Sequence, residues 1–293
     1  MNITTREIDS QPDVWRQALR LLPTVGPLLA RPGERVLVIG CGTSAFVAES
    51  FALLRETAGL GETDAAYASE PRPWRPYDAV IAITRSGTTT EVAEALEALP
   101  AGVRKVVVTG VEDSPCAALA DEVVLLDFAD EESVVQTRFP TTLLLLARAA
   151  FGEDVSALPD RAAAVLASDA PDLPGVFDHV VYLGRGWTYG LAEEAALKIR
   201  EAAQAWAESY PLLDYRHGPL AVAHPGSLVW LIGTTDDDLA RDIRTTGATV
   251  VQGLADDPLI ELALAQRFAV RVAESRGLDP DQPRHLTRSI VLS

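Results

Sequence analysis

The sequence predicts an α/β protein made of two tandem, doubly wound parallel-sheet domains of the flavodoxin-like kind, with flanking helices. Two observations predict this fold. Strand-like runs rich in Val, Ile and Leu alternate with amphipathic helical patterns, and continuous apolar strands are typical of a parallel sheet covered on both faces. In addition, residues 35–54 match residues 179–198, an offset of 144 in a chain of 293 residues.

Each copy of this repeat opens in the same way. An apolar strand leads into a Gly-x-Gly turn, and the turn leads into an amphipathic helix. We therefore expect one domain over residues 1–152, with an N-terminal helix and the first sheet. A second domain is expected over residues 153–293, with the second sheet and a C-terminal tail.

The elements of the first domain follow from apolar runs and helix-start signals. A packing helix at 12–30 opens with Pro12 and Asp13, which are typical of a first helical turn. Strands rich in β-branched and aliphatic residues are expected at 35–40, 63–67, 78–84, 104–109 and 122–126. Helical patterns between them predict helices at 44–57, 89–99 and 115–120.

The second domain repeats this alternation. A long helical pattern at 133–151, followed by one at 158–168, bridges the two copies. Strands are then expected at 179–183, 227–232 and 248–252. Helices are expected at 187–207, 236–245 and 258–275.

Composition argues against several classes of partner. The net charge of −17 disfavours nucleic acid. The polar N-terminus lacks the apolar segment of a signal peptide, and the longest apolar run, at 142–151, is shorter than the about 20 residues that span a bilayer. Cys41 and Cys116 form neither a disulfide framework nor a metal-binding spacing. We expect a reduced, cytoplasmic protein that binds neither nucleic acid nor a membrane.

The Gly-x-Gly turns do not predict a dinucleotide site. The full fingerprint needs a third glycine, and Ala45 and Tyr189 stand at that position in the two copies. We therefore reject NAD binding.

A hydroxyl-rich turn follows the strand expected at 78–84. Thr84, Ser86, Thr88, Thr89 and Thr90 surround Gly87 and lead into a helix. Hydroxyl groups together with free N–H groups at a helix start suit a phosphate monoester, and without a Walker lysine this turn is not a nucleotide P-loop. A capping box formed by Thr88 and Glu91 is the alternative interpretation.

Two further hydroxyls, those of Thr43 and Ser44, follow the first Gly-x-Gly turn. Ligands of open parallel sheets bind outside the carboxyl ends of the strands. Both hydroxyl clusters lie at such ends in the first domain, so we expect them to face one ligand.

The helix expected at 187–207 carries a candidate for proton transfer. Of the 25 basic residues only Lys105 and Lys198 are lysine, and Lys198 stands three residues before Glu201 on one helix face. A carboxylate, a cation and the downstream His217 suit proton transfer on an anionic substrate. The alternatives are an ordinary helix ion pair and a histidine that only supports a turn. Glu193 and Glu194 are assigned to the helix surface.

At this point the chain resembles the SIS (sugar isomerase) domain family, and most closely the isomerase half of glucosamine-6-phosphate synthase. The resemblance covers essentially the whole chain. Its motifs lie in the family's order, at residues 7–12, 40–44, 84–89, 194–201, 217–220 and 281–289.

The resemblance implies a role for each site residue. The sugar phosphate would be bound by Thr43, Ser44, Thr84, Ser86 and Thr89, with Arg85 as an added cation beside the loop. Glu201 would move a proton between C1 and C2 through an enediol-type intermediate, and Lys198 would lie near the sugar oxygens or amine. His217 would open the sugar ring and, as in such proteins, would come from the other subunit of a homodimer. No metal or redox cofactor is implied.

The sequence departs from the family at two places. Arg288 takes the place of a catalytic tail lysine; it is kept as a candidate catalytic residue, although a guanidinium forms no Schiff base. The sequence carries no glutaminase region, so we do not expect a complete synthase. The predicted function is an isomerase or deaminase of an amino-sugar 6-phosphate. Alternatives are a deglycase on a sugar-phosphate amine adduct and a non-catalytic phosphosugar-binding regulator.

Overall fold

The structure is a computed structural model that describes residues 1–292 except 71–74, 169–172 and 174–176. It consists of two compact units. The N-terminal unit comprises Ser10–Pro159 and Thr287–Ser293, and the C-terminal unit comprises Met1–Asp9 and Asp160–Leu286. The first residues of the chain thus pack with the second half, and the tail packs with the first half. A domain division after residue 152 stays a prediction.

The N-terminal unit holds a five-stranded parallel sheet in the order β2-β1-β3-β4-β5. Its strands are β1 (Val36–Gly40), β2 (Thr63–Tyr67), β3 (Ala79–Ile83), β4 (Arg104–Thr109) and β5 (Glu122–Leu125). Its helices are α2 (Gln11–Leu29), α3 (Thr43–Thr57), α4 (Thr90–Glu97), α5 (Pro115–Ala118), η1 (Asp127–Ala129) and α6 (Arg138–Ala150).

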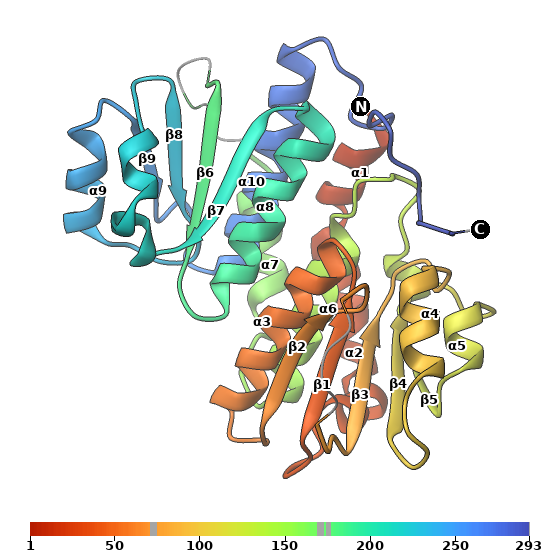
Figure 1. The fold of residues 1–293 in the computed structure, drawn as a ribbon. Helices are drawn as coiled ribbons and strands as arrows, with labels where there is room; N and C mark the ends of the chain where they lie inside the picture. Colours follow the sequence, from red (N-terminus) through yellow and green to blue (C-terminus); the bar gives the residue numbers. More distant parts are fainter. Residues whose placement is uncertain (71–74, 169–172, 174–176, 293) are drawn as a thin grey trace. The chain divides into compact units, whose positions relative to one another are not determined.

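Helices cover both faces of this sheet (Figure 1). The helix α3 packs on β1 and β2, and α6 packs on α2 and α3. On the other face, α4 and α5 form an apolar cluster with alternate residues of β1, β3 and β4. Because the central strands β1 and β3 lie between these helical layers, every residue of β1 and β3 is buried.

The C-terminal unit holds a four-stranded parallel sheet in the order β7-β6-β8-β9. Its strands are β6 (His179–Gly184), β7 (Trp206–Pro211), β8 (Ser227–Leu231) and β9 (Thr249–Gln252). Its helices are α1 (Ile3–Asp9), α8 (Thr188–Ala203), η2 (Asp214–His217), η3 (Pro219–Val222), α9 (Asp237–Arg244) and α10 (Pro258–Ser275), and α7 (Leu158–Leu166) runs across the boundary between the units. The connectivity repeats that of β2-β1-β3-β4. The predicted fold of two tandem, doubly wound parallel sheets is therefore confirmed.

Three elements of the C-terminal unit differ from the expectation. The helix expected to reach residue 207 ends at Ala203, because Gln204 adopts a left-handed conformation with φ 49°. The chain then forms the edge strand β7, which the sequence analysis did not predict. The short helix α1, which packs on α10, was also not predicted.

His179 of β6 and Glu208 of β7 form a polar pair between neighbouring strands of the second sheet. His179 Nε2 lies 3.0 Å from Glu208 Oε2, and Trp206 Nε1 donates to the same carboxylate at 3.3 Å. Burial by itself would raise the pKa of Glu208, but hydrogen bonds from His179, Trp206 and Tyr210 outweigh it and lower this pKa below its ordinary value.

The lowered pKa of Glu208 predicts how the free energy of unfolding changes at acid pH. A carboxyl pKa that is lower in the folded state stabilises the fold at neutral pH, and this contribution is lost as pH falls through the folded-state value, below about pH 4. The substitution Glu208→Gln should therefore lower the free energy of unfolding at pH 7 and have little effect at about pH 3. Urea denaturation at the two pH values measures this. An equal loss at both would contradict the assignment.

Candidate active site

The first group of site residues lies where the strand order of the first sheet reverses. In the order β2-β1-β3-β4-β5 the chain moves outward in opposite directions from β1 and β3, which are neighbours. The segments that leave their carboxyl ends are residues 40–44 and 84–89. This switch point is where doubly wound sheets bind ligands. Both predicted hydroxyl clusters are at this position.

The turn after β1 requires glycine for a steric reason. A Cβ atom on Gly40 would lie 2.6 Å from the main chain of Ser44, closer than real Cβ contacts. The same close approach recurs in the second sheet, where a Cβ on Gly184 would lie 2.2 Å from the carbonyl oxygen of Thr188. The tight turn starts α3 at Thr43, and the side chains of Thr43 and Ser44 are buried there.

The turn after β3 is built around Gly87. Its φ is +66°, and a Cβ atom would lie 2.0 Å from Ser114 Oγ, so only glycine fits. The N-cap of α4 is Thr89, whose side chain makes no capping hydrogen bond. Thr88 Oγ1 instead lies 3.1 Å from Ser86 Oγ. The alternative capping box at Thr88 is therefore wrong.

One hydroxyl of this turn has no partner within the part of the chain that the structure describes. Thr84 Oγ1 is shielded from solvent and makes no hydrogen bond to the described residues. A buried hydroxyl without a partner is costly, and a bound anion or water is the usual explanation. Ser86 is also buried, so both hydroxyls lie in the interior at the switch point.

The side chain of Arg85 is buried and forms hydrogen bonds to main-chain carbonyl groups. Its guanidinium is only 2% exposed and donates to the carbonyl oxygens of Glu131 at 3.1 Å, Ser133 at 3.0 Å and Arg288 at 2.6 Å. These hydrogen bonds connect the hydroxyl-rich turn to residues 131–133 and to Arg288 of the C-terminal tail. A direct bond from Arg85 to phosphate stays a prediction.

The C-terminal tail is attached to the same turn. Arg288 donates to the Glu131 carbonyl at 2.7 Å and forms an ion pair with Asp130. Ser289 Oγ lies 3.0 Å from Thr88 Oγ1, and the amide of Leu292 donates to Thr90 Oγ1 at 2.9 Å. Arg288 thus lies beside the predicted phosphate loop and is engaged in anchoring the tail.

The second group of site residues lies on α8 in the C-terminal unit. Lys198 is 1% exposed, and its Nζ lies 2.6 Å from Glu201 Oε2 and 3.3 Å from Glu194 Oε1. Glu194 is also 1% exposed, whereas the side chain of Glu201 is 18% exposed. The pair is therefore not an ordinary surface ion pair. Of the two carboxylates, Glu201 is the one that a ligand can reach.

Glu194 is a residue that the sequence analysis misplaced. It was assigned to the helix surface, but the structure buries it against Lys198. The signal was present in the spacing, because residues 194, 198 and 201 follow the i, i+4, i+7 pattern of one helix face.

His217 lies apart from this cluster in the chain. It ends the short helix η2, is exposed, and is followed by Gly218 at φ 145°. Among the described residues no hydrogen bond or ion pair is recorded for its ring. Beside it, burial raises the pKa of Tyr215 to about 12.

The burial of Lys198 between two carboxylates predicts that its removal lowers the free energy of unfolding. In Lys198→Met the buried carboxylate of Glu194 and the partly exposed carboxylate of Glu201 would both lose their cation, which should cost about 3–5 kcal/mol. The matched substitution Lys105→Met, at the other lysine, should cost about 0.5 kcal/mol or less. Urea denaturation at pH 7 compares the two proteins. Equal losses would contradict the role of Lys198 as the counter-ion of the cluster.

In the described part of the chain, no helix is both long and apolar enough to cross a membrane. No group of three or more His, Cys, Asp or Glu side chains there is arranged to hold a metal ion.

Comparisons with known proteins match one family. The model of the SIS domain matches residues 28–151. The chain is 29% identical to a glutamine–fructose-6-phosphate aminotransferase (isomerizing) of Gloeobacter violaceus, over 98% of this chain and 58% of that protein. It is 30% identical to the enzyme of the same name from Aeropyrum pernix, over 88% of this chain and 51% of that protein. The chain thus spans little more than half the length of these relatives.

Solved structures share the fold over nearly the whole chain. Glucosamine-6-phosphate deaminase from Thermotoga maritima superposes with a TM-score of 0.83 at 26% identity and covers 99% of this chain and 100% of its own. The C-terminal domain of glucosamine-fructose-6-phosphate aminotransferase from Francisella tularensis superposes with a TM-score of 0.84 at 20% identity, over 97% of this chain and 98% of its own. At that identity the second likeness concerns the fold alone.

Proposed function

Because the chain belongs to the SIS domain family, we propose that it is a phosphosugar isomerase or deaminase acting on an amino-sugar 6-phosphate without a cofactor. The names of its relatives support this substrate class, since they act on fructose 6-phosphate or glucosamine 6-phosphate. In this proposal the hydroxyl-rich turns of the first sheet bind the phosphate, and the Lys198 cluster on α8 carries out the proton transfer.

The phosphate is proposed to bind at the switch point of the first sheet. Ser86, Thr84 and Thr89 offer hydroxyl donors, and the first turn of α4 offers main-chain N–H groups after that of Thr90, which donates to the Ile290 carbonyl oxygen. Oriented N–H groups bind a phosphate without basic side chains, which suits a chain with a net charge of −17. Thr43 and Ser44 complete the proposed phosphate site.

Glu201 is proposed to be the base. It would take the proton from C2 of the open-chain sugar and return it at C1. Lys198 lies 2.6 Å from the carboxylate and would stabilise the enolate-like charge that develops on the sugar oxygen. Glu194 would position Lys198 as it does in this structure, at 3.3 Å.

The fate of the nitrogen follows from this proton transfer. Moving the C2 proton to C1 converts an amino aldose into a ketose imine with the C=N bond at C2. Water then adds to C2, the C–N bond breaks, and ammonia leaves. The sum is amino-sugar phosphate plus water to ketose phosphate plus ammonia, so the reaction needs no oxidant or reductant.

Ring opening is assigned to His217, supplied by a second copy of the chain in a homodimer. Imidazole exchanges protons near neutral pH and can serve the ring oxygen. Leu213 and Val222, on either side of the loop that carries His217, are 50% and 61% exposed, and the proposal places them at the dimer interface. Arg288 is proposed to hold the tail at the phosphate site rather than to exchange a proton.

The observation that carries the proposal is the buried lysine between two carboxylates on α8, one of them partly exposed. Incubation with glucosamine 6-phosphate, followed by assays for ammonia and fructose 6-phosphate, tests it. Equal amounts of both products are expected. Binding without product formation would favour a phosphosugar-binding regulator, and release of a larger amine from a sugar–amine adduct alone would favour a deglycase.

A further inference from the structure

The described residues of the connection between β2 and β3 place no helix on the first sheet. Parallel crossovers usually carry a helix that covers the sheet. The helices α3 and α4 do so for their strand pairs, but residues 68–70 and 75–78, the described part of this connection, contain no helix.

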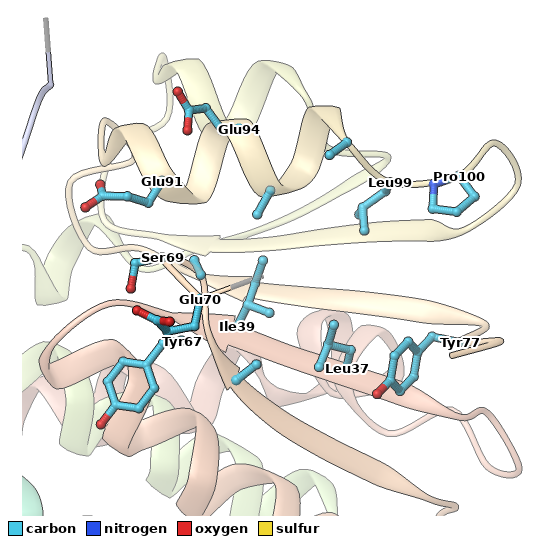
Figure 2. Close-up of a pocket in the computed structure, with 14 residues that line it drawn as sticks. Leu37, Ile39, Tyr67, Ser69, Glu70, Tyr77, Glu91, Glu94, Leu99 and Pro100 are labelled. Atoms are coloured by element: carbon cyan, nitrogen blue, oxygen red, sulfur yellow. The ribbon is translucent and has the colours of Figure 1, made fainter. Parts of the chain in front are cut away.

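A pocket of 490 Å³ lies between α4 and the strands β1 and β2. Leu37 and Ile39 of β1 form part of its floor (Figure 2), and Ala66 of β2 and Ala95 of α4 also line it. Leu37 and Ile39 belong to the apolar cluster of the sheet, so residues of the hydrophobic core form this wall of the pocket.

The two ends of the pocket differ in chemistry (Figure 2). Tyr77, Leu99 and Pro100 lie at one end, and Glu70 and Glu91 lie at the other. Its charged lining residues, within the described chain, are all carboxylates, those of Glu70, Glu91 and Glu94. The pocket is thus an apolar slot with an anionic end.

Glu91 lacks a donor at this end. Its Oε2 atom is shielded from solvent and accepts no hydrogen bond from the described residues. A shielded carboxylate oxygen without a donor is costly. Burial, and next the negative charge of Glu91, raise the pKa of the Cys41 thiol.

We propose that the pocket binds a small organic cation, a primary ammonium group on a short aliphatic body. The aliphatic body would lie between Leu37, Ile39 and Ala95. The ammonium group would donate to Glu91 and Glu70, which gives Glu91 Oε2 its missing donor. An inorganic cation would leave the apolar slot unused, and a neutral or anionic molecule would leave the carboxylates unpaired.

This site is distinct from the proposed phosphate site. No residue of the hydroxyl-rich turn at 84–89 lines the pocket. The pocket contains no basic group among its described lining residues, so it does not suit a phosphate. The proposal also stands apart from the proposed function, because its test measures the binding of an amine and not turnover.

Calorimetric titration with n-hexylammonium at pH 7 tests the proposal, with hexanoate and 1-hexanol as chain-matched ligands. We expect saturable binding of the amine with a Kd of about 1 mM or tighter, and much weaker binding of the other two. Glu91→Gln should weaken amine binding about tenfold or more. Glu97→Gln, on the exposed side of the same helix and outside the pocket, should leave the Kd unchanged. Ala95→Leu should abolish binding by filling the slot.

Three results would overturn the proposal. They are the absence of saturable amine binding, equal affinity for all three ligands, and an equal loss of affinity in Glu91→Gln and Glu97→Gln. Thermal unfolding of each variant checks that it is folded. If Ala95→Leu fails to fold, the comparison of Glu91→Gln with Glu97→Gln decides.

Discussion

Replacement of Glu201 by glutamine is expected to lower kcat by about 10²–10⁴-fold, the usual contribution of a general base. Glutamine keeps the shape of the side chain and can still accept a hydrogen bond from Lys198, but it cannot take a proton. Lys198 also keeps Glu194, 3.3 Å away, so the fold should be retained. The dissociation constant of the phosphosugar should change by less than about threefold, because Glu201 acts in the transition state.

Glu193→Gln is the matched control for this prediction. It makes the same chemical change on the same helix, at a residue without a proposed catalytic role. Steady-state rates and calorimetric binding of glucosamine 6-phosphate are measured for both variants. Turnover of Glu201→Gln at the wild-type rate, or an equal loss in Glu193→Gln, would rule out the assigned base.

The double substitution Thr84→Ala and Ser86→Ala is expected to act on binding. Each hydrogen bond to a charged phosphate contributes about 1.5–3 kcal/mol, so loss of the two should raise KM by at least about 100-fold. The proton-transfer groups lie on another part of the chain, so kcat at saturation should fall much less.

The control for this prediction is Thr234→Ala. Thr234 follows β8, the strand that corresponds to β3 in the second sheet, but the sequence there has no comparable hydroxyl cluster. Its KM should stay near the wild-type value. Competition by inorganic phosphate adds a second measure, and it should be lost only in the double variant. An unchanged KM in the double variant would place the phosphate elsewhere.

Much of the fold could be predicted because its signals are local. Periodic apolar runs located the strands of the first sheet to within one residue at most ends, for example at β2 and β4. The strand β7 was missed because the alanine-rich pattern of α8 continues past Ala203. The helix α8 ends where Gln204 adopts a left-handed backbone conformation, and a glutamine at this position does not predict that conformation.

The site was predictable in its residue types and less so in its contacts. Spacing along the helix brought Lys198 and Glu201 together correctly, since neighbours at i, i+3 share a face. The partners of Arg85 lie 46, 48 and 203 residues away in the chain, and no local pattern specifies them. Likewise the pocket beside α4 is lined by residues of β1, β2 and α4 that are distant in the sequence, and no local motif specifies it.

The most direct test of the account is a crystal structure of the Glu201→Gln protein with glucosamine 6-phosphate. The account predicts phosphate oxygens within hydrogen-bond distance of the Ser86 and Thr89 hydroxyls, and C1 and C2 of the same molecule beside residue 201 of either copy in the dimer. A sugar phosphate seated away from the turn at 84–89, or with its C1 and C2 remote from residue 201 in every copy, would contradict it.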